Sequence, residues 1–422
     1  MAVENPTTGA ADRGASRARQ WQFGLLYFSE GAPIGFLWWA MPTLLRSDGV
    51  AVERITALTA ALVLPWTLKF LWAPLIDAWR GPRWGFRAWA ASAQVAMGLC
   101  LLPLVFIDPA EGFGLWFALL LAHAVCAATQ DVAIDALAVA AVPAEERGRV
   151  NAAMQVGMLG GRSVFGGGAI LLAGWGGWPV VFGALVTAVW VSLVVLLTRI
   201  KEPPVEAAQA EAPRTFGRTL RGVLARRTTW WGVGFALVAG AGFEAAGALA
   251  GPLLVDLGVP NTTTGWFFAL AVVTAMAIGG IVGGRWSDRG ERVGRVMLAL
   301  LAMSALVATL GLAVTLGVPG WGAMIGLALV YLGIGAFTAS SYALFMDLTD
   351  RRLGATQFST FMAATNGCEA WAAWLAGRAV GAAGYGPGFL LMAGLGLFGL
   401  LFLAGLRGEQ EEIEPGVEPA SR

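Results

Sequence analysis

The sequence predicts an all-α membrane protein with twelve transmembrane helices, arranged as two six-helix bundles with both termini in the cytoplasm. Hydrophobic residues make up 57% of the 422 residues and charged residues only 13%, too few to cover a soluble protein of this length. Long apolar stretches recur along the whole chain. A charged loop around Asp77 also recurs around Asp288, 211 positions later and half the chain length away, so the chain reads as a duplicated membrane bundle.

Twelve apolar stretches are separated by charged or Gly/Pro-rich breaks. Each contains roughly 20 predominantly apolar residues, which is the length a helix needs to cross the hydrocarbon core. We place the spans at residues 21–45, 55–79, 86–107, 113–142, 149–173, 178–200, 229–255, 263–285, 293–315, 320–343, 354–378 and 383–407.

The basic residues predict the orientation, because they bias short loops toward the cytoplasm during insertion. Of the 28 Lys and Arg residues, only Arg46, Arg54 and Arg378 fall in loops expected outside, and Lys69 and Arg162 fall inside spans. The polar first 20 residues precede a span that is too long for a signal-peptide core and has no cleavage site. We therefore expect no removed signal and both ends inside.

The expected domains follow from these breaks. Residues 1–20 form an N-terminal tail, 21–200 the first bundle, 201–228 a cytoplasmic linker, 229–408 the second bundle and 409–422 an acidic tail. The basic end of the linker, Arg218 to Arg227, is interpreted as a positive-inside anchor, with binding to anionic lipid headgroups as the alternative.

Several function classes are excluded by what the spans carry. Cys100, Cys126 and Cys368 all fall inside spans and are odd in number, which favours apolar packing over disulfides or a metal site. The single histidine, His123, is interpreted as a packed, hydrogen-bonded residue, with a proton carrier as the alternative. The sequence shows no nucleophile constellation, metal-ligand cluster or phosphate loop, so we expect neither an enzyme nor a bound cofactor or metal.

The two halves repeat beyond the charged loop. The string PTLLRSDGV (Pro42–Val50) resembles PLLVDLGV (Pro252–Val259), and Asp135 matches Asp347 at a similar offset. Two parallel repeats of six helices, related by an axis along the membrane normal, define the major facilitator arrangement, in which the solute site lies between the halves near the bilayer midplane.

Particular strings also carry a resemblance to one branch of the major facilitators, the AmpG-type branch. They are LPWTLKFLWAPLID (Leu64–Asp77), TQDVAIDALAV (Thr129–Val139) and GATQFSTFMA (Gly354–Ala363). The opening string, YFSEGAPIGFLWWAMPTLLR (Tyr27–Arg46), is most similar to the siderophore-permease subgroup. The resemblance implies a permease for anhydromuropeptides, siderophores or acetyl-CoA in the bacterial inner membrane.

Ionisable residues inside the bilayer are functional candidates, because each costs several kcal/mol unless it faces a partner or water. The candidates for proton coupling or solute contact are five acids, Glu30, Asp131, Asp135, Glu244 and Glu369. Away from the span ends, only Lys69 and Arg162 supply positive charge inside the membrane, so three of these acids lack a permanent counter-charge. Because protonation costs less than burying a bare carboxylate, protons are the expected coupling ion and sodium is the alternative.

Substrate-binding candidates lie beside these charges: Arg162, Lys69, Gln130, Gln155, Asn366 and Trp371. Arg162 either pairs with Asp131 or binds an anionic group of the solute. Lys69 either contacts the solute or extends its long side chain to the cytoplasmic interface.

Gating candidates lie in the two repeated loops: Asp77 and Arg80 in the first copy, and Asp288 and Arg289 in the second. An acid at a helix end, followed by basic residues about one turn later, can lock two helix ends together while they still rock.

The sequence thus predicts a proton-coupled importer of a medium-sized polar organic solute, such as a siderophore or an anhydromuropeptide. The alternatives are an acetyl-CoA carrier or other carrier of the same branch, and a non-transporting receptor or signalling protein on the same scaffold. Expected partners are the solute and the lipid bilayer, with no nucleic acid, and the chain is expected to be a monomer.

Overall fold

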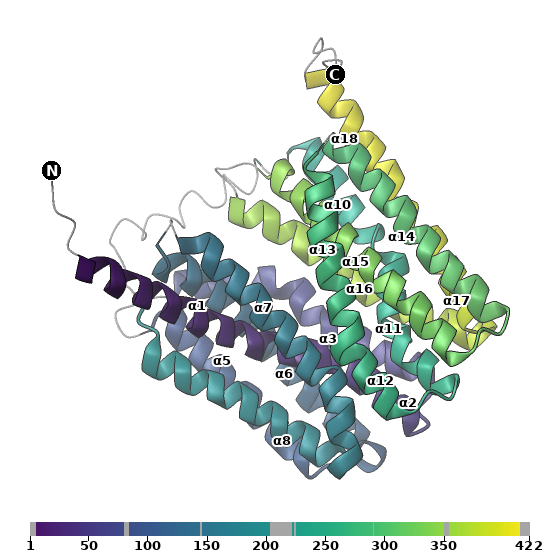
Figure 1. Ribbon diagram of the computed structural model, residues 1–422, viewed down its shortest axis with the longest axis horizontal. Coiled ribbons are helices and arrows are strands. Elements are labelled where there is room, and N and C mark those ends of the chain that lie inside the picture. Colours follow the sequence, from purple (N-terminus) through teal and green to yellow (C-terminus); the bar gives the residue numbers. More distant parts are fainter. Residues whose placement is uncertain are drawn as a thin grey trace. The chain divides into compact units, whose positions relative to one another are not determined.

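The computed structural model describes residues 6–79, 84–143, 146–202, 222, 225–289, 291–349 and 354–413. These residues are predominantly helical (Figure 1). Nine helical segments among them are long and apolar enough to cross a membrane. One of these, Arg147–Arg199, covers two of the expected spans, since its 53 residues include a break at Gly176 and Gly177. The all-helical membrane fold is confirmed, whereas the number of twelve and the orientation stay predictions.

The helices form two compact units. Unit 1 comprises Met1–Leu44, Leu71–Gln209 and Pro260–Leu270. Its elements are α1 (Pro6–Gly35), η1 (Phe36–Ala40), α4 (Ala73–Ala78), α5 (Phe86–Leu101), η3 (Leu102–Val105), α6 (Pro109–Ala141), α7 (Arg147–Phe165), α8 (Gly167–Arg199) and α12 (Asn261–Trp266), which leads into η6 (Phe267–Val272).

Unit 2 comprises Leu45–Phe70, Ala210–Val259 and Ala271–Arg422. The short helix α2 (Met41–Ser47) leads into it, followed by α3 (Val52–Leu68), η2 (Lys69–Leu71), α10 (Arg227–Val238), α11 (Ala241–Asp256), α13 (Val273–Ser287), α14 (Arg292–Thr315), α15 (Gly320–Leu348), α16 (Gly354–Ala383), α17 (Tyr385–Gly396) and α18 (Gly399–Ile413). Each unit therefore holds one segment from the other half of the chain, and the bundle boundaries 21–200 and 229–408 stay predictions.

The fifth and sixth spans differ from their expected limits. The expected break lies between residues 173 and 178, but α7 already ends at Phe165 and α8 begins at Gly167. A second interruption follows at Gly176 and Gly177, where Gly177 has a φ of +64° that other residues rarely adopt. The apolar composition runs unbroken through Gly166–Gly168, which is why hydropathy alone did not reveal the first break.

Helix α1 packs along α7 through glycines that bring the two backbones together. A Cβ added at Gly31 would lie 2.2 Å from the Met158 carbonyl oxygen, and one added at Gly161 would lie 2.2 Å from the Phe28 carbonyl oxygen. Small residues permit such close approach in membrane proteins, where helix association depends on packing and not on expelling water. This contact fixes the level of Arg162 on α7, because a Cβ at Gly35 of α1 would meet the Arg162 backbone.

The neighbouring ends of α5 and α8 cap each other. The Glu202 carboxylate, just after α8, accepts hydrogen bonds from the backbone N–H groups of Phe86 (2.9 Å) and Arg87 (3.0 Å) at the start of α5. The Arg87 guanidinium in turn donates to the carbonyl oxygens of Leu196 and Leu197 at the end of α8. Negative charge at a helix start and positive charge at a helix end both stabilise the helix.

Replacing Glu202 with alanine is expected to lower the stability of the detergent-solubilised protein by about 1 kcal/mol, because the first N–H groups of α5 lose their acceptor. Thermal melting measures the effect. Lys201→Ala, at the exposed neighbouring position, is the matched control and should leave the melting temperature unchanged. Equal melting temperatures for Glu202→Ala and the control would contradict the capping role.

Candidate functional site

Three of the predicted acids gather around one tyrosine in unit 1. Glu30 on α1 and Asp131 on α6 are buried, with 4% and 7% of their surface exposed, whereas Asp135 is exposed one turn further along α6. The Tyr27 hydroxyl, one turn before Glu30, donates a hydrogen bond to Asp135 Oδ1. All three carboxylates lie close enough to the Tyr27 phenol for their charges to act on it. The structure thus brings Glu30, Asp131 and Asp135 together.

Tyr27 was not among the predicted site residues. Its position three residues before Glu30 puts both on one face of α1, and that spacing is the signal that could have revealed it. We call Tyr27, Glu30, Asp131 and Asp135 the acidic cluster.

Arg162 lies on α7, and its guanidinium packs on the ring of Trp38 in η1, the short helix that follows α1. Its guanidinium carbon sits 4.7 Å from the centroid of the Trp38 ring, and its Nη2 lies 3.5 Å from the Met158 sulfur. A guanidinium over an indole face is held by cation–π attraction and keeps its plane available for a flat anion such as a carboxylate. The predicted pairing with Asp131 stays a prediction.

Two amide candidates from unit 1 occupy different surroundings. Gln130 is completely buried, and neither its amide oxygen nor its amide nitrogen has a hydrogen-bond partner among the described residues. Gln155 on α7 is exposed. Of the two amides, Gln130 is therefore the one that a bound solute or water could stabilise by hydrogen bonding, since an unsatisfied buried polar group costs about 1–3 kcal/mol.

The acids of unit 2 lie near a buried thiol. Glu369 on α16 is buried with 8% of its surface exposed, and Glu244 on α11 is half-buried. Both lie close enough to the Cys368 thiol for their charges to act on it. The structure therefore brings the two unit-2 acids to one place between α11 and α16, as it does the three acids in unit 1.

The remaining candidates of unit 2 are half-buried: Asn366, Lys69 and Trp371. The Trp371 indole N–H donates to the Leu237 carbonyl oxygen at 2.8 Å, which ties α16 to α10. That N–H is already engaged, so Trp371 can offer a solute only the face of its ring.

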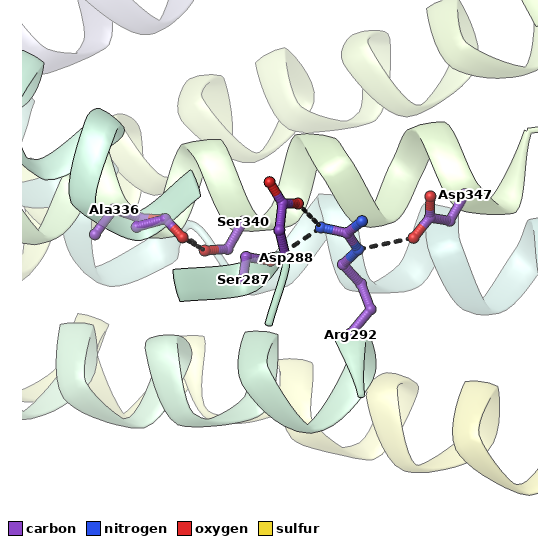
Figure 2. A network of polar contacts seen from close by, with 7 residues as sticks. Ser287, Asp288, Arg292, Ala336, Ser340 and Asp347 are labelled. Carbon is purple, nitrogen blue, oxygen red and sulfur yellow. Dashed lines mark hydrogen bonds and ion pairs between the residues drawn. The ribbon is translucent and has the colours of Figure 1, made fainter. Parts of the chain in front are cut away.

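The second of the two repeated loops forms an ion-pair network (Figure 2). Arg292, the first residue of α14, donates from Nη1 to Asp288 Oδ1 and from Nε to Asp347 Oδ2, both at 2.8 Å. Its Nη1 also lies 3.3 Å from the Ser287 hydroxyl. The network joins the end of α13, the start of α14 and the end of α15, and we call Asp288, Arg292 and Asp347 the loop network.

The base that bridges these acids differs from the predicted one. Arg289 is exposed, whereas Arg292 lies one helical turn after Asp288, at the spacing that favours an ion pair. Arg80 and the Asp77 side chain of the first copy lie outside the described residues.

A second ion pair holds the start of α7 to α1. Arg19 on α1 binds Glu146 through two hydrogen bonds, from Nε at 2.8 Å and from Nη2 at 2.6 Å. The Glu146 side chain is only 14% exposed. The hydrogen bonds from Arg19 lower the pKa of the Glu146 carboxyl below its ordinary value.

This pair predicts a pH-dependent contribution to stability. Because the pKa of Glu146 is lowered in the folded protein, the pair stabilises above the ordinary glutamate value of 4.5, and this contribution disappears as the pH falls through the lower folded value. Melting curves of the wild type and of Arg19→Gln, recorded across this range, are expected to differ most above pH 4.5 and to converge below it. A difference that is constant with pH would contradict the prediction.

The neutral candidates behave as packing residues. His123 is buried with 3% exposed, and its Nδ1 lies 3.2 Å from the Met97 carbonyl oxygen, as expected for a packed, hydrogen-bonded histidine. Within the described part of the chain, no group of three or more His, Cys, Asp or Glu residues could hold a metal ion.

The fold and these sites define a class: a multi-pass helical membrane protein with clustered acids in its spans and ion pairs at its helix ends. The sequence profile of the Major Facilitator Superfamily matches residues 23–249. The chain belongs to this superfamily.

Two relatives indicate which branch of the superfamily the chain resembles. The chain is 26% identical over 408 residues to the anhydromuropeptide permease of Escherichia coli strain K12, which covers 90% of this chain and 78% of the relative. It is also 26% identical over 406 residues to an uncharacterized protein of Haemophilus influenzae, with 91% and 94% covered. These relatives support assignment to the AmpG-type branch and a location in the bacterial inner membrane.

Solved structures share the fold. A D-xylose-proton symporter superposes with a TM-score of 0.72 at 13% identity and covers 92% of this chain and 96% of its own. The nucleoside transporter NupG superposes with a TM-score of 0.70 at 13% identity, with 92% and 99% covered. These structures support the fold alone. The superfamily profile and the permease relative together make the chain a transporter, with a small-molecule solute and the lipid bilayer as its partners.

Proposed function

We propose that the protein imports a medium-sized polar organic solute together with protons. The observation that carries the proposal is the acidic cluster of unit 1, in which the Tyr27 phenol donates to Asp135 and lies within reach of the charges of Glu30 and Asp131. Asp131 and Asp135 lie in the candidate membrane span Gly112–Ala141. Like charges held together cannot all stay ionised at low cost, so at least one carboxyl binds a proton readily. A group that binds a proton on one side of the membrane and releases it on the other is what proton symport requires.

Glu244 and Glu369 form a second candidate for proton binding. Their charges both act on the Cys368 thiol within unit 2, and Glu369 is buried. With one acidic site in each unit, a carrier could bind and release protons at two places during a transport cycle.

Arg162 is proposed to bind an anionic group of the solute. Its stacking on Trp38 holds the guanidinium in one orientation, so a carboxylate can be bound by two parallel hydrogen bonds. Trp38 also offers an aromatic surface beside that charge for an apolar or sugar face of the solute. Gln130 is proposed to contribute further hydrogen bonds from its buried amide.

Anhydromuropeptides and siderophores are the solutes that fit best. The relative from Escherichia coli is an anhydromuropeptide permease, and the opening string of the chain resembles siderophore permeases. Only two bases, Lys69 and Arg162, are expected deep in the spans and away from their ends, which disfavours a solute with as many phosphates as acetyl-CoA. The loop network is proposed to gate the end of the helices that is expected to be cytoplasmic, together with Asp77 and Arg80.

Uptake by purified protein in proteoliposomes tests the proposal. Labelled anhydromuropeptide, a siderophore with and without iron, and acetyl-CoA are each supplied to the same vesicles under an inward proton gradient. One of the first two is expected to accumulate, and a protonophore should abolish accumulation. Accumulation that needs sodium and ignores the protonophore would replace proton coupling with sodium coupling, and binding without uptake of any solute would favour a receptor.

A further inference from the structure

An apolar groove runs along the surface of unit 1, where α5 and α8 pack along each other (Figure 1). It is lined by Leu102 and Val105 at the end of the α5 segment and by one face of α8 between residues 183 and 195. Its volume is about 650 Å³, within the range of about 300–1,000 Å³ that is common for ligand pockets. The lining belongs to two candidate membrane spans, Phe86–Val105 and Arg147–Arg199.

The α8 side of the groove is one continuous stripe. Gly183, Thr187, Val191 and Val195 all line the groove, and their spacing of four residues places them on the same helix face. The Thr187 hydroxyl donates back to the Gly183 carbonyl oxygen at 2.8 Å, so its polar group is satisfied within the helix. The stripe therefore offers mainly hydrocarbon contacts to whatever occupies the groove.

Glycines make room for the groove at two levels. The Trp190 ring, which lines the groove, lies against Gly98 of α5, where an added Cβ would be 2.0 Å from the indole nitrogen. At Gly183 an added Cβ would meet no atom within 4 Å. Protein atoms thus leave open space around Gly183.

The length of the stripe matches one leaflet of a bilayer. Residues 183 to 195 rise by about 18 Å along α8, compared with about 15 Å for half of the hydrocarbon core. Val191 and Val194 are 49% and 58% exposed on the surface of the unit. Apolar side chains exposed within a span are stable only against hydrocarbon, so an acyl chain suits both the surface and the length of the groove.

The stripe leads to positive charge at the end of α8 that is expected to be cytoplasmic. Arg199, one turn beyond Val195, is the last residue of α8 and is exposed. Among the residues that the structure describes, no acid forms an ion pair with Arg199. The Arg87 guanidinium lies at the same helix end, bonded to two carbonyl oxygens, while the Glu202 carboxylate accepts from N–H groups of α5. This end of the groove therefore suits an anionic phosphate.

A flexible chain fits the stripe better than a second transmembrane helix does. Helices in membranes associate closely where small residues face each other. Here the branched side chains of Val191, Val194 and Val195 stand beside a single glycine, Gly183.

We infer that the groove binds one acyl chain of an anionic phospholipid, whose phosphate lies at Arg199. The guanidinium binds the phosphate through charge-assisted hydrogen bonds, and the chain covers the apolar stripe. Because the lipid contacts both α5 and α8, its binding stabilises unit 1 by mass action. The inference rests on the membrane fold and not on the proposed transport function.

Native mass spectrometry of the detergent-solubilised protein measures the binding. Delipidated protein is titrated with phosphatidylglycerol, which is anionic, and with phosphatidylcholine of the same acyl chains, which is zwitterionic. The wild type is expected to bind one phosphatidylglycerol more tightly than any phosphatidylcholine. Arg199→Ala should weaken this phosphatidylglycerol about fivefold, the usual effect of one arginine near a charged membrane surface, and leave phosphatidylcholine unchanged. Lys201→Ala removes an exposed base just beyond α8 and is the matched control, with no change expected.

Gly183→Leu tests the apolar part of the site. The new side chain extends into the open space around residue 183 and displaces part of the acyl chain. Loss of a few methylene contacts should weaken both lipids about tenfold. Gly174→Leu is the matched control, since Gly174 is also on α8 with no atom within 4 Å of an added Cβ but lies outside the groove.

Three results would overturn the lipid site. Unchanged phosphatidylglycerol binding by Gly183→Leu would place the lipid elsewhere, and equal losses in Arg199→Ala and Lys201→Ala would reduce the effect to general charge at the helix end. A dimer that Gly183→Leu abolishes would identify a second copy of the chain as the occupant. Gel filtration checks that each variant is folded, and the two charge variants decide the matter if Gly183→Leu is not. Failure of all solutes in the uptake assay would reject the transport function and leave the lipid site standing.

Discussion

Replacing Arg162 with alanine is expected to abolish solute uptake while the protein still inserts and folds. Arg162 supplies a positive charge within the unit-1 spans, and its stacking on Trp38 fixes the direction in which it can bind an anion. Removing one partner of a desolvated charge pair typically costs about 2–5 kcal/mol, which corresponds to a loss of affinity of at least about thirtyfold.

Uptake into proteoliposomes under a proton gradient measures this loss. Gel filtration of the detergent-solubilised variant checks that the protein is still folded. Arg162→Lys is the informative second variant: it keeps the charge but loses the planar fork and most of the stacking, so it should retain partial uptake with a raised KM. Arg54→Ala, at the exposed start of α3, is the control for charge removal alone. Normal uptake by Arg162→Ala would remove Arg162 from the mechanism.

Glu369→Gln is expected to uncouple or strongly slow proton-driven accumulation. Glutamine has nearly the shape of protonated glutamic acid but cannot release a proton, so Glu369 would be fixed in the neutral form. The variant should still exchange labelled for unlabelled solute across the membrane while failing to concentrate it against a gradient.

Asn366→Asp is a useful contrast, because it adds a carboxyl one turn from Glu369 on the same helix α16. Accumulation by Glu369→Gln at the wild-type level and with wild-type pH dependence would contradict a coupling role, whereas loss of both exchange and accumulation would indicate a damaged solute site.

The sequence alone predicted the helical membrane class, the superfamily arrangement and the branch. These rest on hydropathy and on local strings, which depend little on how helices rotate about their axes. The break at Gly166 was missed, because a glycine-rich apolar run does not change hydropathy.

Contacts between helices were harder to predict than the residues themselves. Glu30, Asp131 and Asp135 were identified as charges that are costly to bury, but their convergence on Tyr27 depends on which faces of α1 and α6 meet. The Trp371 indole was expected near the solute, which stays a prediction, and the bond from its N–H to the Leu237 carbonyl oxygen was not foreseen. That bond depends on the height of α16 relative to α10, which no sequence spacing specifies.

The loop network is another contact between helices that the sequence did not specify fully. The repeated loop pointed to Asp288 and Arg289 as gating residues, which stays a prediction. The base that pairs with Asp288 is Arg292, and Arg289 is exposed. The ion pair between Arg46 and Asp256 was not predicted, because the two matching strings carry different charged residues. Only the structure shows that the two side chains meet.

Solute-dependent proton entry tests the central claim most directly. Proteoliposomes containing a trapped pH indicator, with no imposed gradient, receive the solute that the uptake assay identifies. The account predicts that the lumen acidifies as solute enters, that Glu369→Gln abolishes the acidification, and that empty liposomes show none. Solute entry at the wild-type rate with no change in internal pH would contradict proton-coupled import.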